Sequence, residues 1–204
     1  MAQSFGEREK ELINEQLIKK GKELFIRFGL RKTSIDELTS AVGIAKGSFY
    51  SFFKSKEYLF MEIKEREERI LKEELVEKSF PNGEINRDRM KYFLTQMFNV
   101  LDEHPILSQL LNEGEMEYFM RKISPEKLQE HEAEDVAFLE ELIDSWQESG
   151  AVRNDYDRDV ILNLIRSLVS ISLMKDRMHI QRYPEMIDLL TEMLADGLTT
   201  GGKK

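Results

Sequence analysis

The 204-residue sequence contains no cysteine, which excludes disulfide bonds, thiolate metal ligands and a cysteine nucleophile. A chain without cysteine fits a reducing compartment, so we expect a cytoplasmic protein. No apolar run approaches the roughly 20 residues of a membrane span. The N-terminal residues MAQSFGEREKEL also lack the apolar core of a signal peptide. We therefore expect a soluble protein with no membrane partner.

The motifs of common enzyme classes are also missing. The sequence has no Gly-rich phosphate loop after a strand, no G-x-S-x-G and no H-E-x-x-H. Its three histidines (His104, His131 and His179) are far apart, and none has the spacing of a metal ligand pair. We predict that the protein is not an enzyme and has no catalytic residue, metal or cofactor.

Strand-like alternation is absent, and apolar residues recur at spacings of three and four instead. Glycine, proline and capping hydroxyls mark the ends of these periodic segments. The pattern predicts an all-α protein with about nine helices. They are expected at residues 7–28, 34–42, 46–53, 56–78, 86–103, 105–111, 124–149, 155–178 and 184–197.

The net charge of −9 is unevenly distributed along the chain. Residues 1–56 carry 11 Lys or Arg and 7 Asp or Glu, whereas the remainder carries 19 and 32. A basic N-terminal region on an acidic body is the asymmetry expected when only one end of a protein meets nucleic acid. The acidic body would repel DNA and help to orient its approach.

Residues 33–56, TSIDELTSAVGIAKGSFYSFFKSK, have the pattern of a helix–turn–helix. Ser34 and Glu37 have the spacing of a capping box at the start of a helix. Gly43 follows the apolar face of this helix, where a left-handed residue would end it. A second short helix is then expected from Lys46 to Phe53, with its phenylalanines facing inward.

The outer face of that second helix presents a cation, a glycine for close approach, two hydroxyls and a phenol. Such groups suit phosphate oxygens and base edges in a major groove. A lysine at the start of the following helix suits a phosphate. We predict DNA contact by Thr33, Ser34, Lys46, Gly47, Ser48, Tyr50, Ser51 and Lys56.

The complete stretch resembles the DNA-binding region of the TetR/AcrR family of bacterial transcriptional regulators. The matching positions read Thr33-Ser34-Ile35, Leu38-Thr39, Val42-Gly43-Ile44-Ala45, Gly47-Ser48-Phe49-Tyr50, Phe52-Phe53 and Ser55-Lys56. Two positions depart from the family pattern. Thr39 stands where the family usually has alanine, and Ala45 stands where a serine usually caps the recognition helix and often contacts a phosphate.

The resemblance implies a three-helix DNA-binding domain, residues 1–55, followed by a larger helical domain for effector binding and dimerisation, residues 56–204. In this family the last two long helices form the dimer interface, here 156–178 and 184–197. A dimer would place two recognition helices on successive major grooves, so the DNA partner is expected to be a palindromic operator. The resemblance thus implies a transcription regulator, most often a repressor, that a small-molecule effector releases from DNA.

The effector pocket is expected among the middle helices of the larger domain. Methionine and aromatic side chains suit an adaptable apolar cavity, although the same residues commonly form plain core. The candidate ligand-binding residues are Phe93, Met97, Leu101, His104, Tyr118, Phe119, Phe138, Trp146 and Met174.

Two other interpretations stay open. The protein could be an architectural or cell-division accessory DNA-binding protein on the same fold, without an effector. It could also be a helical protein-interaction module that no longer binds DNA, which only Ala45 favours.

Overall fold

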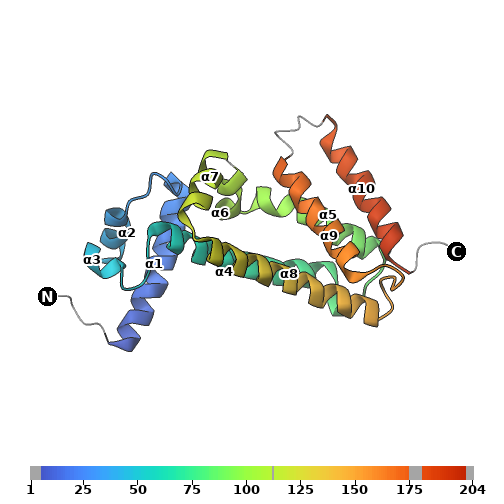
Figure 1. Ribbon diagram of the computed structural model, residues 1–204, viewed down its shortest axis with the longest axis horizontal. Coiled ribbons are helices and arrows are strands. Elements are labelled where there is room, and N and C mark those ends of the chain that lie inside the picture. The colour runs from blue at the N-terminus through green and yellow to red at the C-terminus, as the bar shows by residue number, and fades with distance from the viewer. Residues whose placement is uncertain (1–5, 112, 175–180, 201–204) are drawn as a thin grey trace. The chain divides into compact units, whose positions relative to one another are not determined.

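The computed structural model describes residues 6–111, 113–174 and 181–200. These residues form ten α-helices and two short 3-10 helices, and their strand-like pairing is limited to one isolated bridge between Val152 and Thr199. The elements, drawn in Figure 1, are α1 (Glu7–Phe28), α2 (Ile35–Val42), α3 (Lys46–Phe49), α4 (Lys56–Ser79), η1 (Pro81–Gly83), α5 (Arg87–Glu103), α6 (Pro105–Ser108), η2 (Gln109–Leu111), α7 (Glu113–Lys122), α8 (Pro125–Glu148), α9 (Arg158–Met174) and α10 (Tyr183–Leu198). The predicted all-α class is confirmed, and the expected number of helices is close to the observed one.

The predicted helix boundaries differ most for α9. The sequence pattern predicts a start near residue 155, whereas the helix begins at Arg158. Asp157 precedes the helix, and its side chain accepts a hydrogen bond from the amide of Asp159 at 2.8 Å. The predicted end at residue 178 lies outside the described residues. Among the described residues, no helix is both long and apolar enough to cross a membrane.

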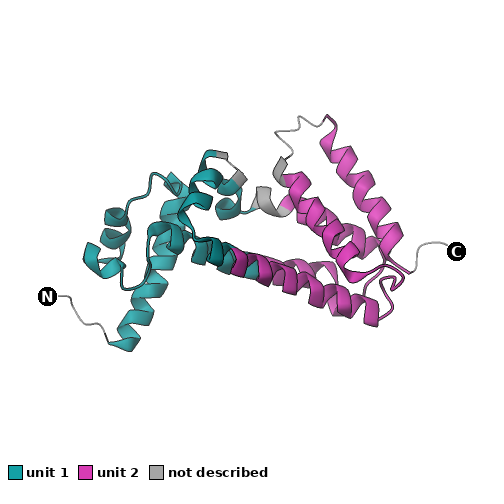
Figure 2. Ribbon diagram, in the orientation of Figure 1, with its two compact units in different colours: residues 1–69, 104–128 teal, residues 70–103, 129–204 magenta. Residues whose placement is uncertain are grey.

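The chain divides into two compact units (Figure 2). Unit 1 comprises residues 1–69 and 104–128, and unit 2 comprises residues 70–103 and 129–204. The segment holding α6 and α7 therefore belongs to the same unit as the helix–turn–helix, although it is distant from it in the sequence. The predicted functional boundary at residue 55 does not coincide with this division and stays a prediction.

The core of unit 1 is built around aromatic side chains from three helices. Phe25 of α1 meets Phe60 of α4 edge to face, with ring centroids 5.4 Å apart. Phe60 meets Phe119 of α7 in the same way, also at 5.4 Å. All three side chains are buried, and each such pair contributes about 0.5–1.5 kcal/mol beyond the apolar area that it buries.

Helices α1 and α4 approach closely at Gly21. A Cβ atom at this position would lie 3.0 Å from Leu59 Cδ2 and 3.1 Å from Ile63 Cδ1, so a larger residue would force these side chains to move. Ion pairs flank the contact, with Arg66 binding Glu15 at 2.9 Å. Unit 1 therefore has a tightly packed base on which the helix–turn–helix is mounted.

The core of unit 2 also has an aromatic centre. The rings of Phe80, Phe93 and Trp146 lie 5.3–5.4 Å from one another, and all three are buried. Helix α5 packs against both α9 and α10. On its outer side, Arg87 of α5 forms ion pairs with Glu192 and Asp196 of α10.

Candidate nucleic-acid interface

Helix α2 has the predicted capping box at its start. The amide of Glu37 donates to Ser34 Oγ at 3.2 Å, and the amide of Ser34 donates to Glu37 Oε2 at 2.8 Å. The bonds that Glu37 accepts from Ser34 lower the pKa of this carboxyl group. The hydroxyl of Ser34 is exposed but already serves the cap, so the sequence-based expectation of a DNA contact there stays a prediction.

The turn between α2 and α3 depends on Gly43, as predicted. This residue has φ 79° and ψ 29°, the left-handed conformation that glycine adopts without a steric penalty, and its amide bonds back to Thr39 and Ser40. Ala45 is the N-cap of α3 and offers no side-chain bond. The first amides of the short helix are therefore not capped by a side chain.

Helix α3 is shorter than predicted. It ends at Phe49, and the expectation that it continues to Phe53 is wrong. Residues 50–52 form turns, in which the amides of Ser51 and Phe52 bond to carbonyl oxygens three residues back. Phe49 is fully buried as predicted. Its ring contacts Tyr50 edge to face at 5.7 Å and Phe53 at 6.0 Å, which anchors the short helix in unit 1.

The predicted outer face of α3 is accessible. Lys46, Gly47, Tyr50 and Ser51 are exposed, Ser48 is partly exposed, and 55% of the Tyr50 surface is free. No Cβ atom added at Gly47 would meet a neighbour within 4 Å, so the backbone there is open to close approach. This face has the groups and the access that contacts with DNA require, and the individual contacts stay predictions.

Lys46 has a partner that the sequence analysis did not identify. Its ammonium group lies 2.8 Å from Asp36 Oδ2 on α2, and this hydrogen bond raises the pKa of Lys46. Both side chains are largely exposed. A phosphate that binds Lys46 must therefore compete with a carboxylate on the same surface.

Thr33 and Lys56, both predicted to contact DNA, form hydrogen bonds to the protein backbone. Thr33 is only 1% exposed, and its hydroxyl donates to the carbonyl of Gly29 at 2.8 Å. The Lys56 ammonium donates to three carbonyl oxygens of the α1–α2 turn, and burial lowers its pKa. A sequence pattern does not show such long-range bonds. DNA contact by these two residues stays a prediction.

The residues predicted to bind an effector are distributed over both units. In unit 2, Phe93 and Trp146 pack against each other in the core, Met97 borders that core, and Phe138 lies under the ammonium group of Lys72 at 5.2 Å. Leu101 and Met174 are also predicted to bind an effector, but the structure does not describe their side chains.

The remaining predicted ligand residues lie in unit 1. His104 is the N-cap residue of α6, Phe119 is part of the aromatic core, and the Tyr118 hydroxyl donates to the carboxylate of Glu57. Several of the nine candidate residues thus have a packing role that does not require a ligand. The ligand-binding assignment stays a prediction.

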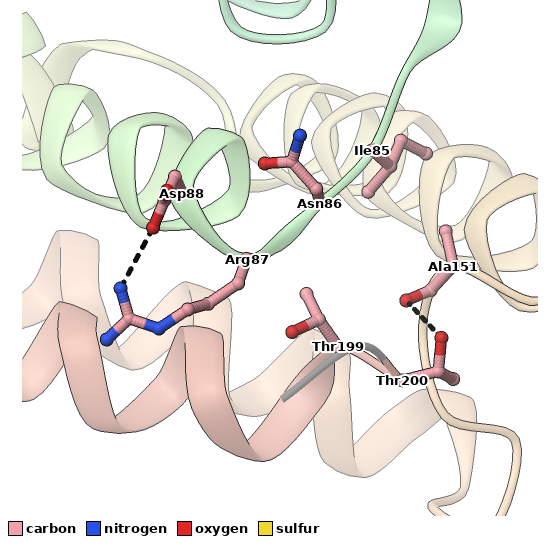
Figure 3. A pocket seen from close by; sticks show the side chains of 7 residues that line it. All are labelled: Ile85, Asn86, Arg87, Asp88, Ala151, Thr199 and Thr200. Carbon is pink, nitrogen blue, oxygen red and sulfur yellow. Dashed lines mark hydrogen bonds and ion pairs between the residues drawn. The ribbon is translucent and has the colours of Figure 1, made fainter. Parts of the chain in front are cut away.

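Unit 2 contains a pocket of about 300 Å³ at the start of α5 (Figure 3). Its lining residues are Ile85, Asn86, Arg87, Asp88, Ala151, Thr199 and Thr200. The guanidinium of Arg87 binds three carboxylates, and the hydroxyl of Thr200 donates to the carbonyl of Gly150 at 2.8 Å. None of the predicted effector residues lines this pocket, and its polar groups are already bonded within the protein.

Comparisons with known proteins agree with the geometry of the helix–turn–helix. Residues 17–63 match the sequence model of bacterial regulatory proteins, tetR family. The transcriptional repressor NemR of Escherichia coli strain K12 is 32% identical over 98 residues, which cover 48% of this chain and 49% of NemR. The chain thus spans about half the length, or less, of the curated relatives that it matches.

Solved structures extend the similarity in fold to nearly the whole chain. A TetR-family transcriptional regulator of Pectobacterium atrosepticum superposes with a TM-score of 0.70 at 18% identity, over 98% of this chain and 100% of that one. The regulator FadR of Bacillus subtilis, solved in complex with stearoyl-CoA, has a TM-score of 0.61 at 17% identity, over 90% of this chain and 98% of that one.

The helix–turn–helix of α2 and α3, packed with α1 and followed by an all-α body, is the fold class of bacterial regulatory proteins. Residues 17–63 thus carry the DNA-binding region of TetR-family regulators, and the fold of nearly the whole chain is similar to that of TetR-family structures.

Proposed function

We propose that the protein is a homodimeric repressor that binds a palindromic operator and is released from it by a small-molecule effector. The observation that carries the DNA-binding part is the exposed face of α3, anchored by the buried Phe49. Lys46, Ser48 and Tyr50 are the residues on this face that we assign to DNA. The name of NemR as a repressor supports the direction of regulation.

Dimerisation is supported by apolar side chains that the single chain leaves exposed on its last two helices. Val160 and Leu164 of α9 are 51% and 39% exposed, and Leu189 and Met193 of α10 are 59% and 63% exposed. Each pair is spaced by four residues, so each forms a stripe along its helix. Neighbouring apolar surface of this kind marks a contact surface, and a second copy would cover it.

A dimer explains how short recognition helices could achieve specificity. One copy of α3 has four residues and reaches only a few base edges. Two copies related by a two-fold axis would read two half-sites about one helical turn apart, which requires a palindromic operator. The effector would act by binding more tightly to a dimer state in which the two recognition helices do not match this spacing.

Selection of binding sites from random duplex DNA at moderate salt tests this proposal. An enriched palindrome, bound by two copies of the chain, is the expected result. That duplex then serves as the probe for small molecules that release the protein, beginning with fatty acyl-CoA esters, because the structurally similar FadR was solved with stearoyl-CoA. Binding without sequence preference that disappears as salt rises would contradict the proposal.

An architectural DNA-binding role without an effector is the alternative. The close packing of Phe93 on Trp146, at the predicted effector site, favours it. Enrichment of a palindrome by a protein that no small molecule releases would support this alternative.

A further inference from the structure

The side chain of Lys56 donates all of its hydrogen bonds to backbone carbonyl oxygens of the protein. Its ammonium group donates to the carbonyl oxygens of Leu30 at 2.8 Å, Arg31 at 2.8 Å and Thr33 at 2.7 Å. A lysine ammonium has three N–H donors and no acceptor. Three carbonyl partners therefore occupy all of its donors, and none is left for a phosphate oxygen.

These three carbonyls belong to the turn that joins α1 to α2. The turn begins after Gly29, which ends α1 with φ 83°, and leads directly to Ser34, the N-cap of α2. Lys56 is the first residue of α4, so its bonds connect the start of α4 to the turn. The backbone just before α2 is thus bonded to a residue 23 positions further along the chain.

Helix α7 contacts the same turn from another direction. The Tyr118 hydroxyl donates to the carboxylate of Glu57, the residue next to Lys56, and Glu57 is only 5% exposed. The Lys56 ammonium lies 5.8 Å from the centre of the Tyr118 ring, and the Arg31 guanidinium lies 5.7 Å from it. Lys122 lies 6.0 Å from the same ring. A cation near a ring face is attracted to it, so the contacts with Lys56 and Arg31 link Tyr118 to α4 and to the turn.

Two further hydrogen bonds join α7 and η2 to the turn and to α1. The amide of Arg31 donates to Glu115 Oε2 of α7 at 3.3 Å. The side-chain amide of Gln109 donates to the carbonyl of Phe25, near the end of α1, at 2.5 Å. All of these residues belong to unit 1 (Figure 2).

We propose that Lys56 and Tyr118 are positioning residues of the DNA-binding face, which hold the α1–α2 turn in place and do not themselves contact DNA. Lys56 bonds to the turn directly, and Tyr118 fixes Lys56 and Glu57 from α7. Together, η2 and α7 thereby set the orientation of α2 and α3. This inference rests on the proposed function, because the positioned surface is the one assigned to DNA.

The salt dependence of DNA binding separates a positioning lysine from a phosphate contact. Each phosphate neutralised by a lysine contributes about 0.9 to the slope of log affinity against log salt. We expect Lys56→Met to weaken binding to the selected palindrome roughly 10- to 100-fold, the range expected for losing bonds that a charged group makes. Its slope on random-sequence DNA should stay that of the unmodified protein.

Lys46→Met is the reference for a lysine on the proposed DNA-binding face, and it should reduce the slope by about 0.9. A reduction of the same size for Lys56→Met would overturn the proposal.

Tyr118→Phe removes only the hydroxyl that binds Glu57. We expect it to lower the ratio of specific to non-specific affinity by roughly tenfold, as the loss of one hydrogen bond to a charged group would. The exposed Tyr92, converted to Phe, is the matched control and should leave the ratio unchanged. A Tyr118→Phe protein that melts at a lower temperature but keeps its specificity ratio would show a merely structural role and overturn the proposal.

Hydrogen exchange of backbone amides tests the positioning without DNA. Both variants should speed exchange at Thr33 and in the first turn of α2, while the amides of α5 exchange as before. Unchanged exchange in α2 would overturn the proposal. If the unmodified protein selects no sequence, the proposed function fails, and the exchange experiment still decides whether these residues hold the turn.

Discussion

The ammonium group of Lys46 lies 2.8 Å from a carboxylate oxygen of Asp36, so the lysine at the start of α3 is paired with an acid of the preceding helix. Both side chains of this pair are exposed, and an exposed ion pair contributes little to folding stability. Its consequence is for DNA binding, because the carboxylate competes with phosphate for the same cation and repels the DNA backbone.

Asp36→Asn is therefore expected to strengthen DNA binding by about two- to fivefold at low salt, the range that corresponds to losing an exposed competing ion pair. The gain should shrink as salt rises, because exposed charges are screened. Titrations of a labelled duplex at several salt concentrations measure both effects. A double-mutant cycle with Lys46→Met is the control: an equal gain with and without Lys46 would mean that Asp36 acts only by general repulsion.

The close contact at Gly21 predicts a specific loss of stability. Gly21→Val places methyl groups where even a Cβ atom would lie 3.0 Å from Leu59, and such overpacking costs about 1–3 kcal/mol. Denaturation by urea, followed by a probe in unit 1, measures the change in unfolding free energy. Gly47→Val, where no neighbour lies within 4 Å, is the matched control. Equal effects of the two substitutions would show that α1 and α4 accommodate the extra volume.

The pair formed by Glu57 and Tyr118 predicts how the stability of unit 1 depends on pH. Burial would raise the pKa of Glu57, but hydrogen bonds from Ser55 and Tyr118 outweigh it and lower this pKa below the ordinary 4.5. A carboxyl group with a lowered pKa adds stability above its unfolded pKa, and this contribution is lost as the pH falls through the folded value. Unit 1 is therefore expected to lose stability below about pH 4.5.

Tyr118→Phe should move this acid-induced loss to higher pH. Without the Tyr118 hydroxyl, one of the hydrogen bonds that lower the pKa of Glu57 is lost, and burial raises this pKa further. Glu57→Gln should remove the contribution of this group and leave only the acid-induced loss that comes from other carboxyl groups, such as Glu37. Urea midpoints measured between about pH 3 and 6 decide between these outcomes. A Tyr118→Phe profile that overlays that of the unmodified protein would contradict the assignment of Glu57 as the titrating group.

The pKa of Tyr118 itself is raised to about 12 by burial and by its bond to Glu57. A tyrosine with a raised pKa adds stability below its unfolded value near 10, and this is lost as the pH rises towards 12. The ultraviolet titration of the unmodified protein should therefore contain a tyrosine that ionises near pH 12. That late step should be missing in Tyr118→Phe.

The exposed apolar stripe on α10 predicts the effect of a charge at the proposed dimer surface. Leu189→Glu should convert dimers to monomers, because pairing would bury an unpaired carboxylate in each copy. Leu12→Glu is the matched control, since Leu12 is also 59% exposed but lies on α1. Sedimentation velocity distinguishes the two species. A Leu189→Glu protein that sediments like the unmodified one would place the dimer surface elsewhere.

The helix–turn–helix could be predicted well because its determinants are local. The Ser34–Glu37 box spans four residues, and Gly43 ends its helix through its own backbone conformation. The predicted extension of α3 to Phe53 failed because periodicity does not distinguish a helix from consecutive turns with the same inward residues. Both arrangements keep Phe49 and Phe53 in contact.

The sequence by itself determined the all-α class, most helix positions and the exposed face of α3, because apolar spacing and capping act over a few residues. Only the tertiary structure decided what the polar side chains of this region bind. Lys56 reaches carbonyls 23–26 residues away, and Tyr118 reaches an acid 61 residues away. Such partners come from different helices, so they are defined only when those helices pack together.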